Sequence, residues 1–372
     1  MKIANKSLGS IEKYIKDYLK GYKPYKTYWN YEDGCVLKGC MDMYHATENG
    51  NYEAFVQAYI DRFVMPDGSI PNYQKDWYNI DSINCGKVLG GLCWGSNKEY
   101  VSKAIEYHMQ RLREHPRCAC GNFMHHSVNA PSQIWLDGLY MALPFYMEYE
   151  MRFSQKKMEN LGDIVSQFKN VRSLLFNEEK GLYIHAYDET RTQPWADKET
   201  GLSQNFWLRS NGWYLMALID CIELCSEQIY EHYRALIDLF REAVRGILRW
   251  QDQETGLFYQ VIDRADEPGN YLETSGSVMV AYAIMKGVRL GVLNDEKYLP
   301  IAKRMFESVC EHKLVPDEEG NMHLRDICLQ AGFNQENRDG SVAYYLSEPR
   351  VCDDSKGVGP FMMAFAEYIR AN

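Results

Sequence analysis

A short glycine-containing turn recurs along the chain and limits the folds that it can adopt. The turn reads DGSI, CGNF, KGLY, TGLF and EGNM, and a large apolar residue always follows two positions after the glycine. The glycines are Gly68, Gly121, Gly181, Gly256 and Gly320, and the apolar residues are Ile70, Phe123, Tyr183, Phe258 and Met322. Glycine permits a turn with positive φ, and the apolar residue can then anchor the chain. The repeat therefore predicts one kind of turn, used five times on one face of the protein.

Between these turns, the apolar residues follow a helical period. The expected helices are 8–21, 33–48, 51–65, 80–95, 97–114, 132–152, 156–177, 207–227, 230–252, 273–291, 295–313 and 357–371. Each interval between turns fits one helical hairpin, so the five turns and closure of the chain predict six hairpins. Because their spacing is irregular, an open solenoid is disfavoured. The sequence predicts an all-α fold, an (α/α)6 barrel forming a single domain over residues 1–372, with the even-numbered helices inside.

Charge and composition exclude several classes of function. The net charge is -10, the pI is about 5.5, and no dense Lys/Arg run is present, which argues against a nucleic-acid partner. The N-terminal stretch lacks the apolar core of a signal peptide, and no long apolar run predicts a membrane span. The eleven cysteines are scattered and odd in number, which is typical of reduced thiols, so a cytoplasmic protein is expected. The sequence shows no convincing cluster of metal ligands.

Polar side chains stand beside tryptophan or tyrosine in four stretches. These contain Asp81 in NIDSINCG, His125 and His126 ahead of Trp135 and Asp137 in QIWLDGLYMALPF, His185 in YIHAYDE, and Trp207, Arg209 and Trp213 in FWLRSNGWY. Each has a structural alternative: a helix cap, a surface turn, a surface ion pair or plain core. In a ring of hairpins, however, all four stretches converge on one rim. Tryptophan can stack on a sugar, arginine can hold a carboxylate, and burial against Trp135 would raise the pKa of Asp137.

Together with LETSGSVMVAYAIMKGVRLG and KGVGPFMMAFAEY, the Asp137, His185 and Arg209 stretches carry a family resemblance. From about Tyr25 to the C-terminus the chain resembles the unsaturated rhamnogalacturonyl hydrolases of glycoside hydrolase family 105, relatives of the family 88 unsaturated glucuronyl hydrolases. The resemblance implies an (α/α)6 barrel. It also implies removal of a 4-deoxy-Δ4,5-unsaturated uronic acid from the non-reducing end of lyase-generated oligosaccharides, such as unsaturated rhamnogalacturonan disaccharide. In this reaction C4 of the enol ether is protonated, water adds at C5, and the hemiketal opens.

The resemblance also implies roles for individual residues. Asp137 would be the acid and then the base, with Asp81 as a second active-site carboxyl group. The residues that would line the sugar pocket are Tyr31, His126, Trp135, His185, Trp207, Arg209 and Trp213. Arg209 is the candidate for contact with the uronate carboxylate. Leu208 and Ser210–Asn211 depart from the expected FWGRGNGWY pattern, and the departure is expected to reshape the rim around the leaving sugar. No metal or organic cofactor is implied, and the expected partner is a small oligosaccharide.

Two other classes of function remain open from the residues alone. His125, His126 and His185 would also suit a sugar epimerase on the same barrel, and the two carboxyl groups would suit a conventional inverting glycosidase. Alternatively, the aromatic side chains could form stacking platforms of a non-catalytic sugar-binding protein. The acidic residues beside the aromatics favour an enzyme.

Overall fold

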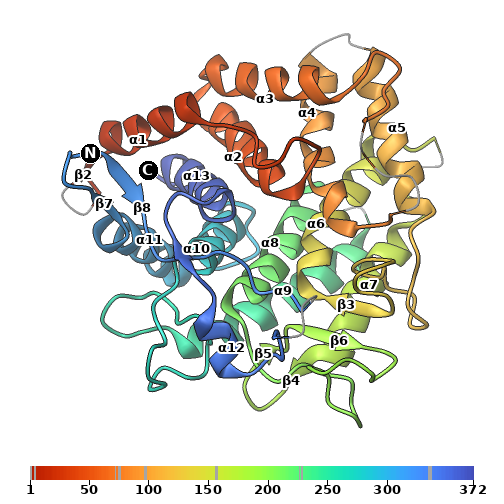
Figure 1. Ribbon diagram of the computed structural model, residues 1–372. Coiled ribbons are helices and arrows are strands. Elements are labelled where there is room, and N and C mark those ends of the chain that lie inside the picture. The colour runs from red at the N-terminus through yellow and green to blue at the C-terminus, as the bar shows by residue number, and fades with distance from the viewer. Residues whose placement is uncertain are drawn as a thin grey trace.

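The computed structural model describes residues 2–3, 6–71, 73, 77–95, 99–155, 158–225, 227, 229–333 and 337–372. Its helices form two concentric rings (Figure 1). The inner ring consists of α2 (Tyr31–Thr47), the 3-10 helix η1 (Ile80–Val88) with α4 (Leu89–Gly95), α6 (Leu136–Glu148), α8 (Leu208–Leu224), α10 (Thr274–Arg289) and α13 (Ser355–Arg370). Each inner helix packs against the next, and α13 packs against α2, so the ring is closed. The predicted (α/α)6 barrel is thereby confirmed.

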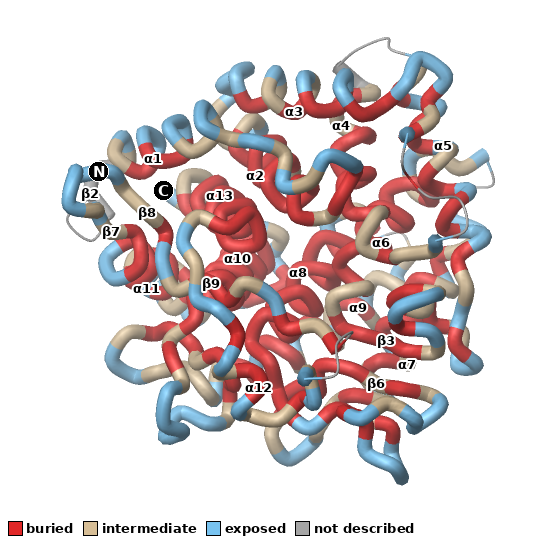
Figure 2. The backbone as a smooth tube through the Cα atoms, in the orientation of Figure 1, coloured by how far each residue is buried: buried red, intermediate tan, exposed pale blue. Residues whose placement is uncertain are grey.

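The outer ring covers the inner one with one helix per hairpin. Its members are α1 (Leu8–Gly21), α3 (Gly50–Phe63), α5 (Glu99–Arg113), α7 (Leu161–Leu175), α9 (Tyr230–Ile247) and α11 (Asp295–His312). The inner helices α8, α10 and α13 are buried on nearly every side, whereas the outer helices expose one face (Figure 2). This division follows from sequence, because apolar residues occupy almost every turn of α10, while α9 alternates them with charged residues. The second, fourth, sixth, eighth, tenth and twelfth of the expected helices are therefore inside, as predicted, and the twelfth corresponds to α13.

All five glycine turns lie where an outer helix gives way to the next inner helix. Their φ angles are 84°, 95°, 67°, 76° and 85°, for Gly68, Gly121, Gly181, Gly256 and Gly320 in that order. Since every such connection reaches the start of an inner helix, the turns share one face of the barrel, as expected. Four of the five short antiparallel strand pairs lie in the same connections: β3 (Gln133–Trp135) with β6 (Ala186–Asp188), β4 (Phe176–Asn177) with β5 (Leu182–Tyr183), β7 (Leu314–Pro316) with β8 (Met322–Leu324), and β9 (Ile327–Cys328) with β10 (Arg350–Val351). The fifth pairs β1 (Lys2–Ile3) with β2 (Lys6–Ser7).

Several predicted helix boundaries are wrong. The helix expected over 132–152 begins only at Leu136, because residues 133–135 pair with β6 as a strand. Its last turn widens to a π-helix, η2 (Tyr149–Phe153), and α9 ends in the 3-10 turn η3 (Leu248–Trp250). The short helix α12 (Val342–Ser347) was not predicted.

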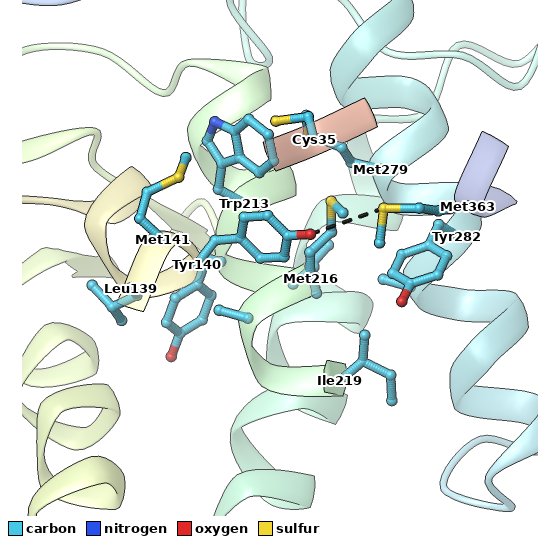
Figure 3. Close-up of a cluster of buried hydrophobic side chains, with 14 of the residues drawn as sticks. Cys35, Leu139, Tyr140, Met141, Trp213, Met216, Ile219, Met279, Tyr282 and Met363 are labelled. Atoms are coloured by element: carbon cyan, nitrogen blue, oxygen red, sulfur yellow. Dashed lines mark hydrogen bonds between the residues drawn. The ribbon is translucent and has the colours of Figure 1, made fainter. Parts of the chain in front are cut away.

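An apolar cluster fills the centre of the inner ring (Figure 3). The Tyr140 ring stacks on Trp213, with ring centroids 4.8 Å apart, and the Tyr140 hydroxyl donates to the Met363 sulfur at 3.9 Å. Trp213 lines a cavity at one mouth of the barrel, whereas Lys87, whose Nζ lies 3.1 Å from the Tyr140 centroid, lines a cavity at the other. The core therefore separates the barrel into two mouths with different linings.

Candidate active site

A cavity of about 240 Å³ opens at the mouth where the inner helices begin. Every site residue predicted from sequence lines it, except His185. The residues that line it from that set are Tyr31, Asp81, His126, Trp135, Asp137, Trp207, Arg209 and Trp213. They come from four of the six hairpins, so the closed ring is what brings them together. Their convergence on one rim agrees with the expectation.

Asp137 lies in the first turn of α6, where its side chain meets a histidine. Trp135 occupies the N-cap position and makes no capping hydrogen bond with its side chain, which leaves the positive end of the helix beside Asp137. Asp137 Oδ2 is 3.3 Å from His185 Nε2. Burial raises the pKa of Asp137, but its contact with His185 and the charge of Arg209 outweigh burial and lower that pKa below its ordinary value. Asp137 is therefore an anion in the free protein, and burial against Trp135 does not keep it protonated.

His185 does not line the sugar cavity, which differs from the expectation. Its side chain is fully buried between Asp137 and the hydroxyl of Tyr345, which is 2.8 Å from Nδ1. When the Tyr345 hydroxyl donates to Nδ1, the Nε2–H of the same ring faces Asp137. His185 thus contacts the Asp137 carboxylate from within the protein and has no exposed surface for a sugar.

Asp81 has the opposite electrostatic character. Asn79 caps helix η1, and its side-chain oxygen accepts from the Asp81 backbone N–H at 3.0 Å, so Asp81 itself is not the cap. Its Oδ1 is buried with no hydrogen-bond partner in the described part of the chain. Burial first, and then the charges of Asp137 and Glu32, raise the pKa of Asp81 well above its usual range. Neighbouring carboxyl groups with pKa values pushed apart are typical of an acid and a base.

Two histidines form the wall next to Asp81. The His125 ring stacks on Trp135 at 4.0 Å, and its Nε2 is 3.8 Å from Asp81 Oδ2. Burial lowers the pKa of His125 to about 3, so the ring is neutral. His126, the histidine assigned to the sugar, uses Nδ1 to accept from the backbone N–H groups of Val128 and Asn129. Both histidines line the cavity, and His125 was not among the sugar contacts expected from sequence.

Arg209 is buried with most of its donors already in use. Nη1 donates to the Cys328 carbonyl and to Ser275 Oγ, and Nη2 donates to the Leu329 carbonyl. Within the described part of the chain, only Nε lacks a partner. These bonds use three of the five N–H donors, so a uronate carboxylate could meet only Nε–H and the second N–H of Nη2.

Sequence reasoning missed several other residues that line the cavity. These are Lys26, Tyr28, Glu32, Trp77, Asn79, Asn129, Gln330 and Arg338, among others. Trp77 and Asn79 flank Asp81 in the same polar and aromatic stretch, so their position offered a signal. The loop that carries Gln330 and Arg338 has no periodicity, and nothing in its sequence points to the cavity.

Comparison with known proteins identifies the barrel. The sequence profile of Glycosyl Hydrolase Family 88 matches residues 4–372. The chain belongs to this family. A solved glycoside hydrolase of family 105 from C. acetobutylicum ATCC 824 is 39% identical, covers 96% of this chain and 98% of its own, and superposes with a TM-score of 0.90. The unsaturated rhamnogalacturonyl hydrolase YesR of Bacillus subtilis is 27% identical over 268 residues, which is 70% of this chain and 72% of that protein. Protein Atu3128 of Agrobacterium fabrum is 39% identical over 233 residues, 61% of this chain and 97% of its own.

Of the three positions expected to depart from the FWGRGNGWY pattern, Asn211 matches it, and Leu208 and Ser210 are the actual differences of this family 88 chain. All three lie away from the cavity. Leu208 packs against Gly276 of α10, where an added Cβ would overlap its side chain. Ser210 donates to the Trp207 carbonyl, and Asn211 binds the Tyr183 backbone. None of the three side chains is among the described residues that line the cavity. The expectation that they reshape the rim is wrong, because each is turned into the core.

Two properties of the whole family 88 chain follow from the same structure. All eleven cysteines are free thiols. Within the described ranges, no helix is long and apolar enough to cross a membrane.

Proposed function

We propose that this glycoside hydrolase removes a 4-deoxy-Δ4,5-unsaturated uronic acid from the non-reducing end of lyase-generated oligosaccharides. One observation carries the proposal: two partly buried carboxyl groups, Asp81 and Asp137, have pKa values moved in opposite directions within a cavity walled by tryptophan. The activity for which the Bacillus subtilis relative is named supports rhamnogalacturonan fragments as the substrate. The whole ring would act as one catalytic domain. We place it in the cytoplasm because none of its eleven cysteines forms a disulfide.

The pKa directions suggest how one proton serves both steps. Asp81 holds the proton in the free protein and delivers it to C4 of the enol ether. Water then adds at C5 and gives its proton to the Asp137 carboxylate, which His185 keeps ionised. The resulting hemiketal opens and the second sugar leaves. Return of the proton from Asp137 to Asp81 restores the pair, so the two carboxyl groups share the acid and base roles that the resemblance gives to Asp137 alone.

The cavity walls would position the sugar around this pair. Trp135, Trp207 and Trp213 are nearly fully buried and offer flat apolar faces to a sugar ring. The Nε1–H groups of Trp135 and Trp207 donate to Gln133 and Gln260, which fixes both rings. Tyr31 and Met141 close the cavity beside them. Such a closed end suits the terminal sugar of an oligosaccharide. It would exclude from the cavity a sugar in the middle of a polysaccharide chain.

The test is loss of the ultraviolet band of the conjugated double bond when the protein acts on a lyase digest of rhamnogalacturonan. A saturated disaccharide with the same linkage is the control, and its cleavage without activity on the unsaturated one would favour a conventional inverting glycosidase. Asp81→Asn and Asp137→Asn should each reduce kcat/KM about 10²- to 10⁴-fold. If Asp137 alone supplies acid and base, Asp81→Asn will regain activity as the pH falls and Asp137 is protonated. If the proton rests on Asp81, that variant will stay inactive at low pH.

A further inference from the structure

The cavity has one closed side and one open side. Trp207, Arg209 and Trp213 lie on the closed side and are at most 2% exposed. On the side of Asp81, Tyr28 is 40% exposed and Trp77 is 38% exposed. A terminal sugar in the closed end must leave the rest of its oligosaccharide pointing toward the open side. The direction of the second sugar follows from this asymmetry, given the proposed function.

A branch of about 70 Å³ leaves the main cavity on that open side. It shares Tyr28, Glu32, Trp77 and Asp81 with the main cavity, so it begins at Asp81. Tyr28 and Trp77 belong to the few large apolar side chains that are exposed on the described surface. Exposed aromatic side chains gathered at the mouth of a cavity mark a binding surface, and their faces suit the C–H face of a sugar.

Glu32 gives the branch a polar acceptor. The residue is 5% exposed, its Oε1 accepts from Lys26 at 3.0 Å, and its Oε2 is buried without a partner among the described residues. A buried carboxylate oxygen without a donor is costly, and a ligand hydroxyl would satisfy it. A sulfate or a second carboxylate on the ligand would instead be placed beside Glu32 and Asp137, and like charges there are unfavourable.

We propose that the branch between Tyr28 and Trp77 binds the second sugar of the substrate, and that Glu32 selects a neutral ring with a free hydroxyl group at that position. The inference rests on the proposed function and narrows it to one class of aglycone. Trp77 and Tyr28 supply apolar contact, and Glu32 Oε2 supplies an acceptor for a hydroxyl of the second sugar. A sulfate or an ionised carboxylate at that place has no proton to donate to it.

The test compares substrates that share the unsaturated uronate and differ in the group attached to its anomeric carbon. They are its methyl glycoside and three disaccharides, whose second sugar is neutral, sulfated or a uronate. The wild-type protein should prefer the neutral disaccharide. Trp77→Ala should raise KM for that disaccharide with little change in kcat, and its loss of kcat/KM should be roughly five- to thirtyfold larger for the disaccharide than for the methyl glycoside. Tyr230→Ala removes an aromatic side chain that is more exposed, 61% against 38% for Trp77, and does not line the cavity. This variant should leave kcat/KM for both substrates unchanged.

Glu32→Gln tests the charge separately from the shape. The amide keeps an acceptor for the neutral sugar but removes the negative charge that repels a sulfate. The ratio of kcat/KM for the neutral disaccharide to that for the sulfated one should therefore fall roughly tenfold or more. Equal losses for methyl glycoside and disaccharide in Trp77→Ala, or a wild-type preference for a charged second sugar, would overturn the inference while leaving the hydrolase intact. No turnover of any of the four unsaturated substrates would instead overturn the proposed function, and the inference with it.

Discussion

At the scale of single residues, two neighbours of opposite charge adjust the pKa of Asp81. Burial and the charge of Asp137 raise that pKa most, Glu32 raises it further, and Lys26 lowers it. If activity needs protonated Asp81, it is lost as the pH rises through that pKa. Glu32→Gln should therefore move the alkaline limb of kcat/KM to lower pH, and Lys26→Met should move it to higher pH. Profiles measured with the methyl glycoside avoid any effect on the second sugar, and shifts in the same direction for both variants would contradict the assignment.

His185 controls the other carboxyl group. Its contact lowers the pKa of Asp137, so activity that needs ionised Asp137 persists to low pH. His185→Gln should raise that pKa and move the acidic limb of kcat/KM to higher pH. Tyr345→Phe, which removes only the hydroxyl next to His185 Nδ1, should move the limb in the same direction by less. A merely structural role for His185 would lower activity equally at every pH.

The candidate residues themselves could be predicted, but their division of labour could not. Asp81 and Asp137 stand out in sequence because each is a carboxyl group among aromatic residues near the start of an inner helix. The order of their pKa values depends on Glu32 and His185, which are remote in sequence and adjacent in space. Burial of His185 behind Asp137 likewise depends on Tyr345, in a helix that the apolar pattern did not predict.

At the scale of elements, glycine allows the first and last inner helices to approach closely. A Cβ added to Gly359 of α13 would overlap the Cys35 carbonyl of α2, and one added to Gly39 of α2 would lie 2.8 Å from the Gly359 carbonyl. The Gly359→Ala variant should lower the free energy of unfolding by about 1–3 kcal/mol, or more if the helices must separate. Gly162→Ala in α7, where no atom lies within 4 Å, is the matched control and should be neutral or slightly stabilising. Urea denaturation of both variants measures the difference.

The glycine turns show which parts of the architecture can be predicted from sequence. A positive φ favours glycine locally, so the five turns could be recognised one by one and counted as hairpins. The strand β3 could not be predicted, because Gln133–Trp135 pairs with β6, which lies beyond two helices, α6 and α7, in sequence. The helical period of apolar residues continues through such a segment. Only its pairing with a strand that is distant in sequence makes it extended rather than helical.

At the scale of the whole molecule, the mouth opposite the active site is closed by ion pairs. A cavity of about 340 Å³ there is lined by charged ends of inner helices. Lys286, 2% exposed, lies 2.7 Å from Asp220 and 2.6 Å from Glu223, and Arg289 joins Glu223 to Glu367. The pKa of Asp220 is lowered although burial opposes this, because Lys286 outweighs burial. The lowered pKa means that the stabilisation is present above the unfolded pKa of Asp220 and is lost as pH falls.

Removal of the central cation tests this cluster. Lys286→Met leaves Asp220 buried without its cation and with the Tyr282 hydroxyl as a donor, and should cost about 3–5 kcal/mol in the free energy of unfolding at neutral pH. The cost should shrink as the pH falls, because Asp220 then takes up a proton. Lys103→Met breaks an exposed pair with Glu99 and should cost about 1 kcal/mol or less. Urea unfolding at neutral and acidic pH distinguishes the two, and an equal cost for both lysines would rule out the cluster as a source of stability.

Closure of the ring by α13 has a consequence for how the protein is made. Nearly every residue of Ser355–Arg370 is buried, and the surfaces that receive this helix belong to α2 and α10. Until the ribosome has added these residues, the apolar faces of α2 and α10 that receive α13 have no partner and stay exposed to water. The nascent chain is therefore vulnerable to aggregation until α13 has been synthesised and can pack. A variant with weakened α13 packing should accumulate as insoluble protein in the cell while remaining active once refolded.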